Sequence, residues 1–590
     1  MFRSLTWLVV LSAQAVFGFA QCQAGPPASD QLNVRAQKIL KDRCHRCHGV
    51  ELSIPELRVL SRDSLVADRG KNARRFVTPG EPQNSKLWDV VRDDYMPPND
   101  KPLSDEDKDI LKQWIVAGAA FPEVTRDGPN MDELAILNAI NTDMQKVIVG
   151  QVHGRVQSTR YFSLAHLYNN PSVSEEMLRL HRAALSKAIN LLSRGKELII
   201  PRALEGTNGT IYAVDLDDLE WESASDWEKV ARLNPYGMRP LNPIEIKLLA
   251  QIQNALGVQF PGFAYVRADW FVVEALRPPL YHELTGIPET SSALESKLGV
   301  DVKGNIQKNR VIRLAMTESG VSKQNRMIER HPMGRGGAYW LSYDFRTNGG
   351  RGNLSRFPLG PKTGEETKDQ FAFEHAGGEI IFTRENGMHG YMLIKEDGAR
   401  INEGPVDIVS DKRETAGSPL IVNGLSCIAC HKHGIIVAKD TIRKSVRLPN
   451  TEAVLKFDEL YPTSEYVGAN AMASDQEAYL KCLEQVIGPF LQVGDDQSKD
   501  IREFAEPVSE VAMYYRQDLD LQQVAVEMFH DPKLLTSQLQ ANETAEGLGL
   551  TGLTEGGRIK RAFWAEREGG VTPFQSLAQS LRKGTPVTGN

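Results

Sequence analysis

Two five-residue patterns with the same order of residue types most constrain what this chain can fold into. Residues 44–48 read CHRCH and residues 427–431 read CIACH, so both have the form C-x-x-C-H. Two thiols three positions apart can each form a thioether with a vinyl group of one porphyrin, and the following histidine can bind the iron from the proximal side. The spacing predicts two covalently attached haem c groups, held by Cys44, Cys47 and His48 and by Cys427, Cys430 and His431.

Two other uses of closely spaced cysteines fit the chain less well. A zinc site needs two paired Cys/His sets at suitable spacing, and a redox-active dithiol does not explain the histidine after the second cysteine. The 590 residues include six cysteines and twelve histidines, so two chance copies of the pattern are improbable. Iron porphyrin is therefore the predicted cofactor.

The amino terminus predicts export. Met1-Phe2-Arg3 and the apolar run over residues 5–20 have the form of a signal peptide spanning residues 1–20, with cleavage expected after Ala20. No later stretch is long and uncharged enough to form a stable membrane span. The net charge of −7 argues against nucleic acid as a partner. We expect the mature chain in the periplasm of a bacterium or otherwise outside the cytoplasm.

Two cysteines lie outside the haem patterns. Cys22 and Cys482 can form a disulfide in an oxidising compartment. Alternatively, Cys482 is unpaired and packs in a helix as a small hydrophobic residue. The sequence leaves both interpretations open.

The first haem-binding region is expected to be a mainly helical domain over residues 31–123. Met96 lies on a loop after His48, and the two prolines that follow it hold the backbone in an extended path. A thioether suits the distal position opposite imidazole, so Met96 is the predicted sixth ligand of the first iron. Ser104 is placed to cap a helix with apolar residues at helical spacing over 110–115.

The order of motifs in this region resembles the planctomycete-type cytochrome c domain. The motifs are CHRCHG at 44–49, LSRDSL at 60–65, Pro79-Gly80 with Ser85, MPP at 96–98, LSDE at 103–106 and Trp114-Ile115. The resemblance implies a class I cytochrome c fold with His48 and Met96 as axial ligands. It implies no particular substrate.

The middle of the chain predicts two further domains, so that the whole is a multidomain α+β protein. Residues 131–233 read as mainly helical, with residues 210–216 alternating like a strand, and residues 241–420 read as α+β. In the second, apolar segments at 380–382 and 391–394 alternate with Asn386-Gly387 and Asp397-Gly398, which tolerate the positive φ angles of hairpin turns. These segments predict an antiparallel meander, extended by residues 339–345. A basic group here either holds haem propionates or is a solvated surface: Arg326, Arg330, His331 and Arg335.

The second haem-binding region is expected to be mainly helical over residues 421–542. Pro419 and Gly424 argue for an extended approach to the second pattern. Met472, before a helix that Ser474 is placed to cap, is the first candidate for the sixth ligand of the second iron. The alternatives are His375, His389 and an open iron position. Residues 543–590 form a Gly-rich tail that is expected to be loosely ordered.

A second resemblance covers residues 131–540. RYFSL at 160–164, GGEIIF at 377–382 and NGLSC at 423–427 are similar to an uncharacterised family of large exported bacterial dihaem c-type cytochromes. This resemblance implies no known activity.

These features favour electron transfer over enzymatic catalysis. A dihaem carrier would exchange electrons with redox partner proteins or a small-molecule donor or acceptor, and cofactor chemistry would carry the reaction. Two alternatives depend on an open second iron. One is a dihaem oxidoreductase, peroxidase-like or a small-molecule oxidase, with catalysis at the second haem. The other is a sensor that binds a diatomic ligand there. The sequence identifies no catalytic residue.

Overall fold

The computed structural model describes residues 28–45, 48, 57–70, 73–98, 101–121, 124, 126, 128–152, 154–222, 225–257, 265–317, 324–362, 369–406, 409–411, 413–443, 446–449, 451–461 and 465–587. The predicted signal peptide, Cys22 and Cys47 lie outside these residues. The fold mixes helix and strand, as predicted, and divides into two compact units. The smaller contains residues up to Arg43 with Leu65–Pro122, and the larger contains Cys44–Ser64 with Glu123–Asn590.

The smaller unit is mainly helical. Helix α5 contacts α1 and α4 and buries Trp114 and Ile115. Its cap is the predicted one, because the Ser104 hydroxyl accepts a hydrogen bond from the Asp107 amide at 3.1 Å. The elements are α1 (Ala28–Ile39), a π-helical turn (Leu40–His45), α3 (Arg62–Val66), the 3₁₀ turn Pro82–Asn84, α4 (Lys86–Arg92) and α5 (Asp105–Val116). The π-helical turn and α3 each include residues assigned to the larger unit.

The larger unit begins with a four-stranded sheet among helices. Its strand order is β2-β3-β1-β5, with β1 antiparallel to β3 and parallel to β5. Strand β3 matches the prediction. Strand β1 lies in a region that was predicted to be mainly helical, because the buried polar residues of β1 hide its strand pattern in the sequence. The elements are α6 (Glu133–Ile148), β1 (Thr159–Ser163), α7 (Ala165–Tyr168), α8 (Glu175–Leu192), β2 (Arg202–Ala203), β3 (Ile211–Asp215), α9 (Ser225–Leu233), β4 (Met238–Arg239), α10 (Pro243–Leu256) and β5 (Tyr265–Arg267).

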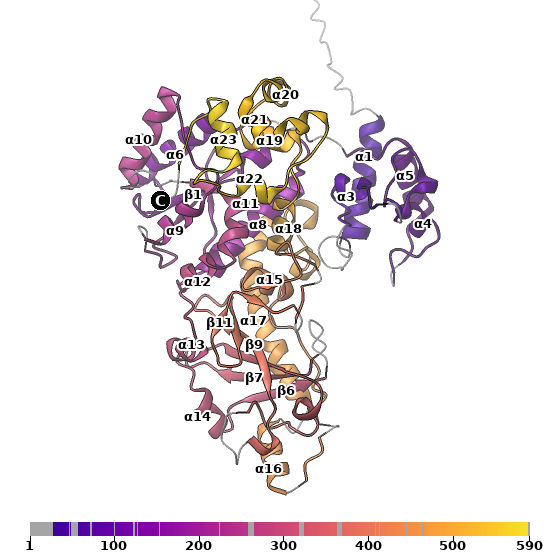
Figure 1. The fold of residues 1–590 in the computed structure, drawn as a ribbon, viewed down its shortest axis with the longest axis vertical. Coiled ribbons are helices and arrows are strands. Elements are labelled where there is room, and N and C mark those ends of the chain that lie inside the picture. Colours follow the sequence, from indigo (N-terminus) through magenta and orange to yellow (C-terminus); the bar gives the residue numbers. More distant parts are fainter. Residues whose placement is uncertain are drawn as a thin grey trace, which may run out of the picture. The chain divides into compact units, whose positions relative to one another are not determined.

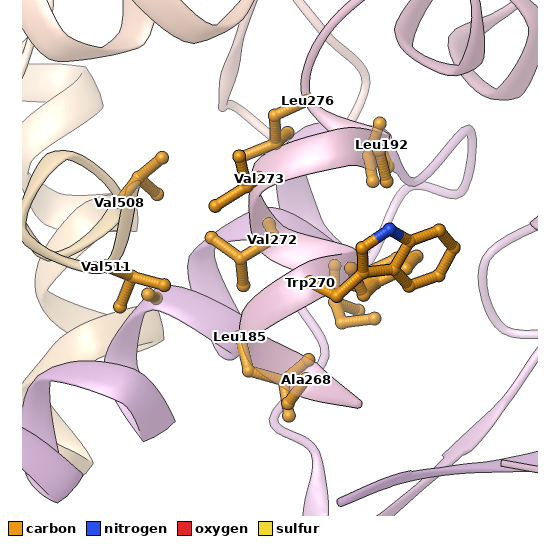
Figure 2. Close-up of a cluster of buried hydrophobic side chains, with 14 of the residues drawn as sticks. Leu185, Leu192, Ala268, Trp270, Val272, Val273, Leu276, Val508 and Val511 are labelled. Carbon is orange, nitrogen blue, oxygen red and sulfur yellow. The ribbon is translucent and has the colours of Figure 1, made fainter. Parts of the chain in front are cut away.

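Three helices form the centre of this unit. Helix α8 contacts α11 (Ala268–Ala275) and α18 (Pro507–Tyr515), which are far apart in the sequence. Figure 2 shows Leu185 and Leu192 of α8, Val272 of α11 and Val508 of α18 in one apolar cluster. Burial of these side chains supplies the main driving force for bringing the segments together.

The predicted antiparallel meander is confirmed and is larger than expected. Six strands pair in the order β11-β10-β9-β8-β7-β6, and Figure 1 shows the long helix α17 (Glu465–Leu491) beside them. Strands β6 and β7 escaped prediction because charged side chains interrupt their apolar pattern. The strands are β6 (Ile312–Met316), β7 (Arg326–Pro332), β8 (Ala338–Phe345), β9 (His375–Thr383), β10 (His389–Lys395) and β11 (Arg400–Ile401).

Short elements connect and flank this sheet. They are α12 (Leu280–Thr285), α13 (Ser291–Leu298), α14 (Val302–Gln307), the 3₁₀ turns Gly350–Gly352 and Asp369–Phe371, β12 (Glu403–Gly404), β13 (Ile421–Val422), α15 (Leu425–Cys430) and α16 (Thr451–Leu460). Among the described residues, no helix combines the length and apolar composition that crossing a bilayer requires.

The prediction of a loosely ordered tail is wrong. Strand β14 pairs with β4, and Trp564 is fully buried with its indole N–H 2.9 Å from a carboxylate oxygen of Glu527. The glycines end short helices rather than loosen the chain. The elements are the 3₁₀ turns Gly494–Asp496 and Ile501–Glu503, α19 (Leu521–Glu527), α20 (Pro532–Gln540), α21 (Glu543–Gly547), the 3₁₀ turn Leu550–Glu555, α22 (Arg561–Ala565), α23 (Pro573–Ser580) and β14 (Thr585–Pro586).

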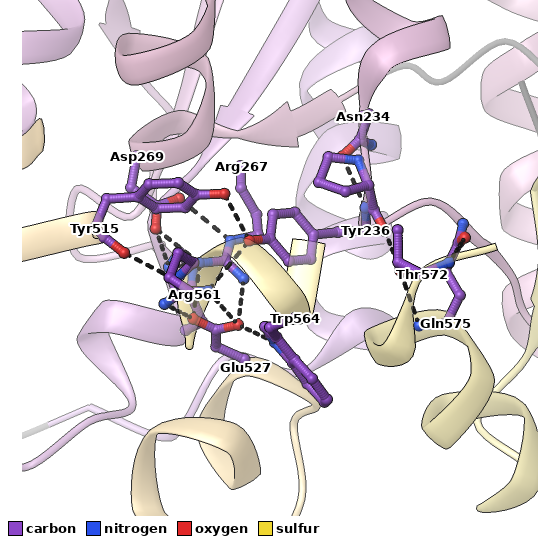
Figure 3. Close-up of polar contacts among 12 residues, drawn as sticks. Asn234, Tyr236, Arg267, Asp269, Tyr515, Glu527, Arg561, Trp564, Thr572 and Gln575 are labelled. Atoms are coloured by element: carbon purple, nitrogen blue, oxygen red, sulfur yellow. Dashed lines mark hydrogen bonds and ion pairs between the residues drawn. The ribbon is translucent and has the colours of Figure 1, made fainter. Parts of the chain in front are cut away.

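A buried charge network joins this carboxyl-terminal region to β5 and α11 (Figure 3). Glu527 accepts hydrogen bonds from Arg561 at 2.6 Å and from Arg267 at 3.1 Å. Arg267 also donates to Asp269 at 2.7 Å. Burial raises the pKa of Glu527, but the two guanidinium groups outweigh this and lower it overall. The two arginines and two carboxylates compensate each other's charge in the interior.

A second carboxylate, Glu133, is partly buried and forms no ion pair with another described residue. The Tyr265 hydroxyl donates to Glu133 at 2.5 Å. The pKa of Glu133 is raised to about 7, mainly by burial. The nearby carboxylates of Glu245 and Asp132 contribute to the increase, and the Tyr265 hydrogen bond partly opposes it. Between pH 4.5 and about 7 the folded chain therefore holds a proton that the unfolded chain has released.

We expect Glu133→Gln to remove a pH dependence of stability. Because the folded-state pKa is raised, the free energy of unfolding falls as pH increases through this window. At pH 8 the variant should be more stable than the native chain by roughly 1–3 kcal/mol, and at pH 4.5 the two should be similar. Urea unfolding across this pH range measures the difference. Glu228→Gln, at an exposed position, is the control, and an unchanged pH slope in Glu133→Gln would contradict the prediction.

Candidate functional site

The second C-x-x-C-H pattern lies on helix α15, entered from an extended segment as predicted. Strand β13 precedes it, and Gly424 begins the helix with φ of +84°. A Cβ at Gly424 would lie 2.4 Å from the Leu276 carbonyl oxygen, so only glycine fits there. Cys427 and Cys430 follow one turn apart, and the His431 amide donates to the Cys427 carbonyl at 2.8 Å. The turn brings both thiols and the imidazole to one end of the helix.

The His431 ring is oriented by the chain itself. Its Nδ1 lies 3.1 Å from the Gly434 carbonyl oxygen. A carbonyl only accepts, so Nδ1 is assigned the proton and donates it. Nε2 is left as the nitrogen with a lone pair, which is the arrangement that a metal-binding histidine needs.

One face of the six-stranded sheet lies against this ring. In the register of β9 and β10, Tyr391 is opposite Ile381 and Leu393 is opposite Glu379, so Glu379, Tyr391 and His389 share a face. The Nε2 atom of His431 lies 3.5 Å from a carboxylate oxygen of Glu379. The rings of Tyr391 and His431 have centroids 6.0 Å apart. The sheet therefore supplies polar side chains on the side where Nε2 points.

Two buried polar atoms at this face have no hydrogen-bond partner within the described chain. They are Nδ1 of His389 and the hydroxyl of Tyr391, although both side chains are buried. Buried polar groups are normally satisfied, so orphaned ones need an explanation. The paired thiols, the oriented imidazole and these unsatisfied atoms together fit a covalently attached haem with a polar surround.

The pKa values of the two thiols are raised, which agrees with a site shielded from water. Burial raises the pKa of Cys427, and the neighbouring carboxylate of Glu379 raises it further. Burial also raises the pKa of Cys430, to about 12. Both thiols are therefore neutral at pH 7 rather than reactive thiolates.

Met472 does not lie before a helix cap. Helix α17 runs from Glu465 to Leu491, so Met472 and Ser474 are both inside it, and the predicted cap at Ser474 is wrong. The local capping pattern was outweighed by helix propensity and by packing against α8. The Met472 side chain is buried, and its sulfur accepts a hydrogen bond from the Ala438 amide at 3.3 Å.

The two histidine alternatives lie in different surroundings. His389, at the start of β10, has its ring centroid 4.3 Å from that of Tyr479 on α17. His375, at the start of β9, packs edge-on against Tyr343 with centroids 5.5 Å apart. Tyr343 donates to Glu329 on the sheet face opposite to His389. Of the two, His389 shares the face of Tyr391 and Glu379.

The basic residues predicted to group near the sheet are each paired with a carboxylate, and only Arg335 lies on a solvated surface. Each member has a carboxylate neighbour, since Arg326 pairs with Asp344, Arg330 with Asp475, His331 with Glu329 and Arg335 with Glu385. His331 is fully buried, whereas Arg335 is exposed. The ion pair from Arg330 to Asp475 ties strand β7 to helix α17.

The first C-x-x-C-H pattern is described at Cys44, His45 and His48. His48 Nδ1 is buried without a hydrogen-bond partner in the described chain, and burial lowers the pKa of this imidazole. The His48 carbonyl accepts from the Val59 amide at 3.2 Å. An orphaned ring nitrogen beside Cys44 fits the same kind of cofactor as the second pattern.

Met96 belongs to the smaller unit, and its own surroundings are local. Its amide donates to the Val90 carbonyl at 3.0 Å, beyond the end of α4, and its side chain is partly buried. The residue thus lies on the predicted loop before the two prolines.

The first pattern and the second both adjoin helix α18 within the larger unit. Arg58 donates to the Met513 carbonyl at 3.1 Å, and His45 Nε2 lies 3.7 Å from Glu510. Helix α15, which carries Cys427 and Cys430, also contacts α18. Segments that lie far apart in the sequence, around His45 and on α15, therefore contact the same helix, α18.

Sequence reasoning missed Glu379, Tyr391 and a buried ion pair. Lys187 on α8 is fully buried and its ammonium lies 2.9 Å from Glu506, the cap of α18. The glycines at 377 and 378 were the available signal for Glu379, because a Cβ at Gly378 would lie 1.8 Å from the Ser342 carbonyl oxygen. Such a close approach of strands marks a specially shaped site.

Comparisons with known proteins identify one part of the chain. No curated protein and no solved structure matches it. The family model of planctomycete cytochrome C matches residues 44–100, which include the first C-x-x-C-H pattern and Met96. The chain thus carries a planctomycete cytochrome C domain near its amino terminus.

Proposed function

We propose that this chain is an exported dihaem c-type cytochrome that transfers electrons. A bound haem c supplies a reversible one-electron iron couple, and the protein sets its ligands and surroundings. The observation that carries the proposal is the second C-x-x-C-H site. There the Nδ1 contact of His431 with Gly434 leaves Nε2 facing the Glu379 carboxylate and the sheet face with buried polar atoms that lack partners. The family match over residues 44–100 supports the first site.

The two attachment segments support transfer between haems. Both adjoin α18, so the chain provides a packed protein path from one to the other. For the second iron, His389 is a better supported sixth ligand than Met472. His389 is buried with an unpartnered Nδ1, whereas the Met472 sulfur already accepts a hydrogen bond from Ala438.

One observation favours a second candidate function. The Glu379 carboxylate, 3.5 Å from His431 Nε2, and the unpartnered Tyr391 hydroxyl can hold or move protons. Such groups suit a dihaem oxidoreductase with catalysis at the second haem. A haem-based sensor would use the same open position.

Optical and magnetic spectra of the purified chain separate these functions. Two low-spin haems that do not respond to peroxide, carbon monoxide or nitric oxide would support the carrier and exclude catalysis and sensing at an open iron. One high-spin haem that binds these ligands would support the second candidate instead. A spectrum with no haem c would reject both.

We expect Met96→Ala to change one haem and leave the other intact. Loss of the thioether should abolish the far-red absorption band of a sulfur–iron bond and lower the potential of that haem by on the order of 100 mV. Met472→Ala is the matched comparison, because it removes a buried methionine near the second site. An unchanged far-red band in Met96→Ala would reject Met96 as a ligand. Loss of far-red absorption in Met472→Ala would reject His389 as the distal ligand of the second haem.

A further inference from the structure

A large cavity lies in the larger unit, and none of the proposed haem ligands lines it. Its volume is about 810 Å³, and it opens between the end of α8, helices α12 and α13, and the turns after β7 and β9. A volume of this size suits a small organic molecule. Five basic side chains and two carboxylates line it: Arg194, Lys196, Lys297, Arg335, Arg384, Glu220 and Glu385.

Two of these cations have only uncharged acceptors. Lys297 donates to the Gly286 carbonyl at 2.6 Å, and Arg384 donates through Nε to the Ser193 carbonyl at 3.1 Å. No carboxylate among the described residues forms an ion pair with either side chain. Their positive charge is therefore uncompensated within the described part of the protein.

The remaining charges do not offset this excess. The Asp226 carboxylate that pairs with Arg194 also binds Lys229 at 3.0 Å. At the rim, Glu385 is shared by Lys196 and Arg335. Glu220 is exposed, and Nε of Arg194 is buried without a hydrogen-bond partner in the described chain.

The cations also oppose one another. Partial burial of its ammonium group lowers the pKa of Lys297, and the nearby Arg384 and Arg194 lower it further. Burial likewise lowers the pKa of Arg384, partly offset by Tyr281, and Arg194 adds to the decrease. A bound anion would relieve this repulsion and satisfy the free donors.

Part of the wall is apolar. The apolar side chains of Leu298 and Met333, both partly exposed, line the cavity together with the two cations. An inorganic ion would leave this surface in contact with water, whereas a molecule with an apolar body would cover it.

We propose that the cavity binds a small organic carboxylate. Its carboxylate group lies between Arg384 and Lys297, and its apolar body lies against Leu298 and Met333. Guanidinium and ammonium groups form strong charge-assisted hydrogen bonds with carboxylates. This inference does not depend on the haem function, because the cavity uses none of its residues.

Calorimetric titration of the haem-loaded chain with benzoate tests the proposal. We expect one benzoate per chain, with binding that weakens as salt increases. Lys297→Gln and Arg384→Gln should each weaken binding about tenfold or more, since each removes a charge-assisted hydrogen bond. Arg346→Gln removes an exposed guanidinium paired with Glu396 elsewhere on the unit, and it should leave the affinity unchanged.

The outcomes that would overturn the proposal are specific. They are no benzoate binding at millimolar concentration, binding of inorganic phosphate without benzoate, or equal benzoate affinity in the native chain and Lys297→Gln. Because Lys297 is exposed, Lys297→Gln should fold. Its benzoate affinity therefore tests the proposal even if Arg384→Gln fails to fold.

Discussion

The double variant Cys427→Ala, Cys430→Ala is expected to carry one covalent haem instead of two. The two thiols lie one turn apart on α15, and in the proposed site each would provide the sulfur of one thioether bond. Without both sulfurs the second haem has no covalent attachment, while the first pattern is untouched. Intact-mass measurement after maturation in a host that attaches haem c should show the loss of one haem mass, and the haem absorbance per chain should fall by about half.

Cys482→Ala is the matched control for this experiment. Cys482 is partly buried on α17 and belongs to neither pattern, so its replacement should leave both haem masses in place. The reciprocal variant Cys44→Ala, Cys47→Ala should keep only the second haem. Two haem masses in Cys427→Ala, Cys430→Ala, or fewer than two in the native chain, would contradict the dihaem assignment.

The second large effect is expected for Glu527→Gln. Both Arg267 and Arg561 bind this buried carboxylate, and Asp269 is the only other carboxylate of the described network that contacts Arg267. Removing one charge leaves a buried guanidinium uncompensated, which costs about 3–5 kcal/mol. Urea unfolding followed by tryptophan fluorescence measures the loss, because Trp564 donates to Glu527.

An exposed ion pair provides the contrast. Glu396→Gln removes the partner of Arg346, where both side chains are about half exposed. Water and salt screen such a pair, so the loss should stay below about 1 kcal/mol. If both variants lost the same small amount, the network in Figure 3 would not be the main link between the carboxyl-terminal helices and β5.

Local patterns predicted many elements of the fold. The Ser104 cap, strand β3 and the strands on either side of Asn386-Gly387 follow from short-range chemistry, because hydrogen bonds and turn angles within a few residues decide them. The capping pattern at Ser474 gave a wrong prediction because it is also local. It carries no information on the helix packing that extends α17 past Ser474.

Strands rich in charge were the main omission. Strand β7 includes Arg326, Glu329 and Arg330, which resemble a solvated segment in the sequence. In the fold each has an oppositely charged partner from another strand or helix. The order of the tail after residue 543 was underestimated similarly, since the hydrogen-bond partner of the buried Trp564 indole, Glu527, lies outside the tail.

The sequence by itself determined the two C-x-x-C-H patterns, because attachment needs two thiols and an imidazole at fixed short spacing. Only the tertiary structure decided what surrounds His431. Glu379 and Tyr391 reach it through strand register, and His389 through the same sheet face. Register and face are set by long-range pairing and by burial of side chains far apart in the chain, and no spacing along the sequence records them.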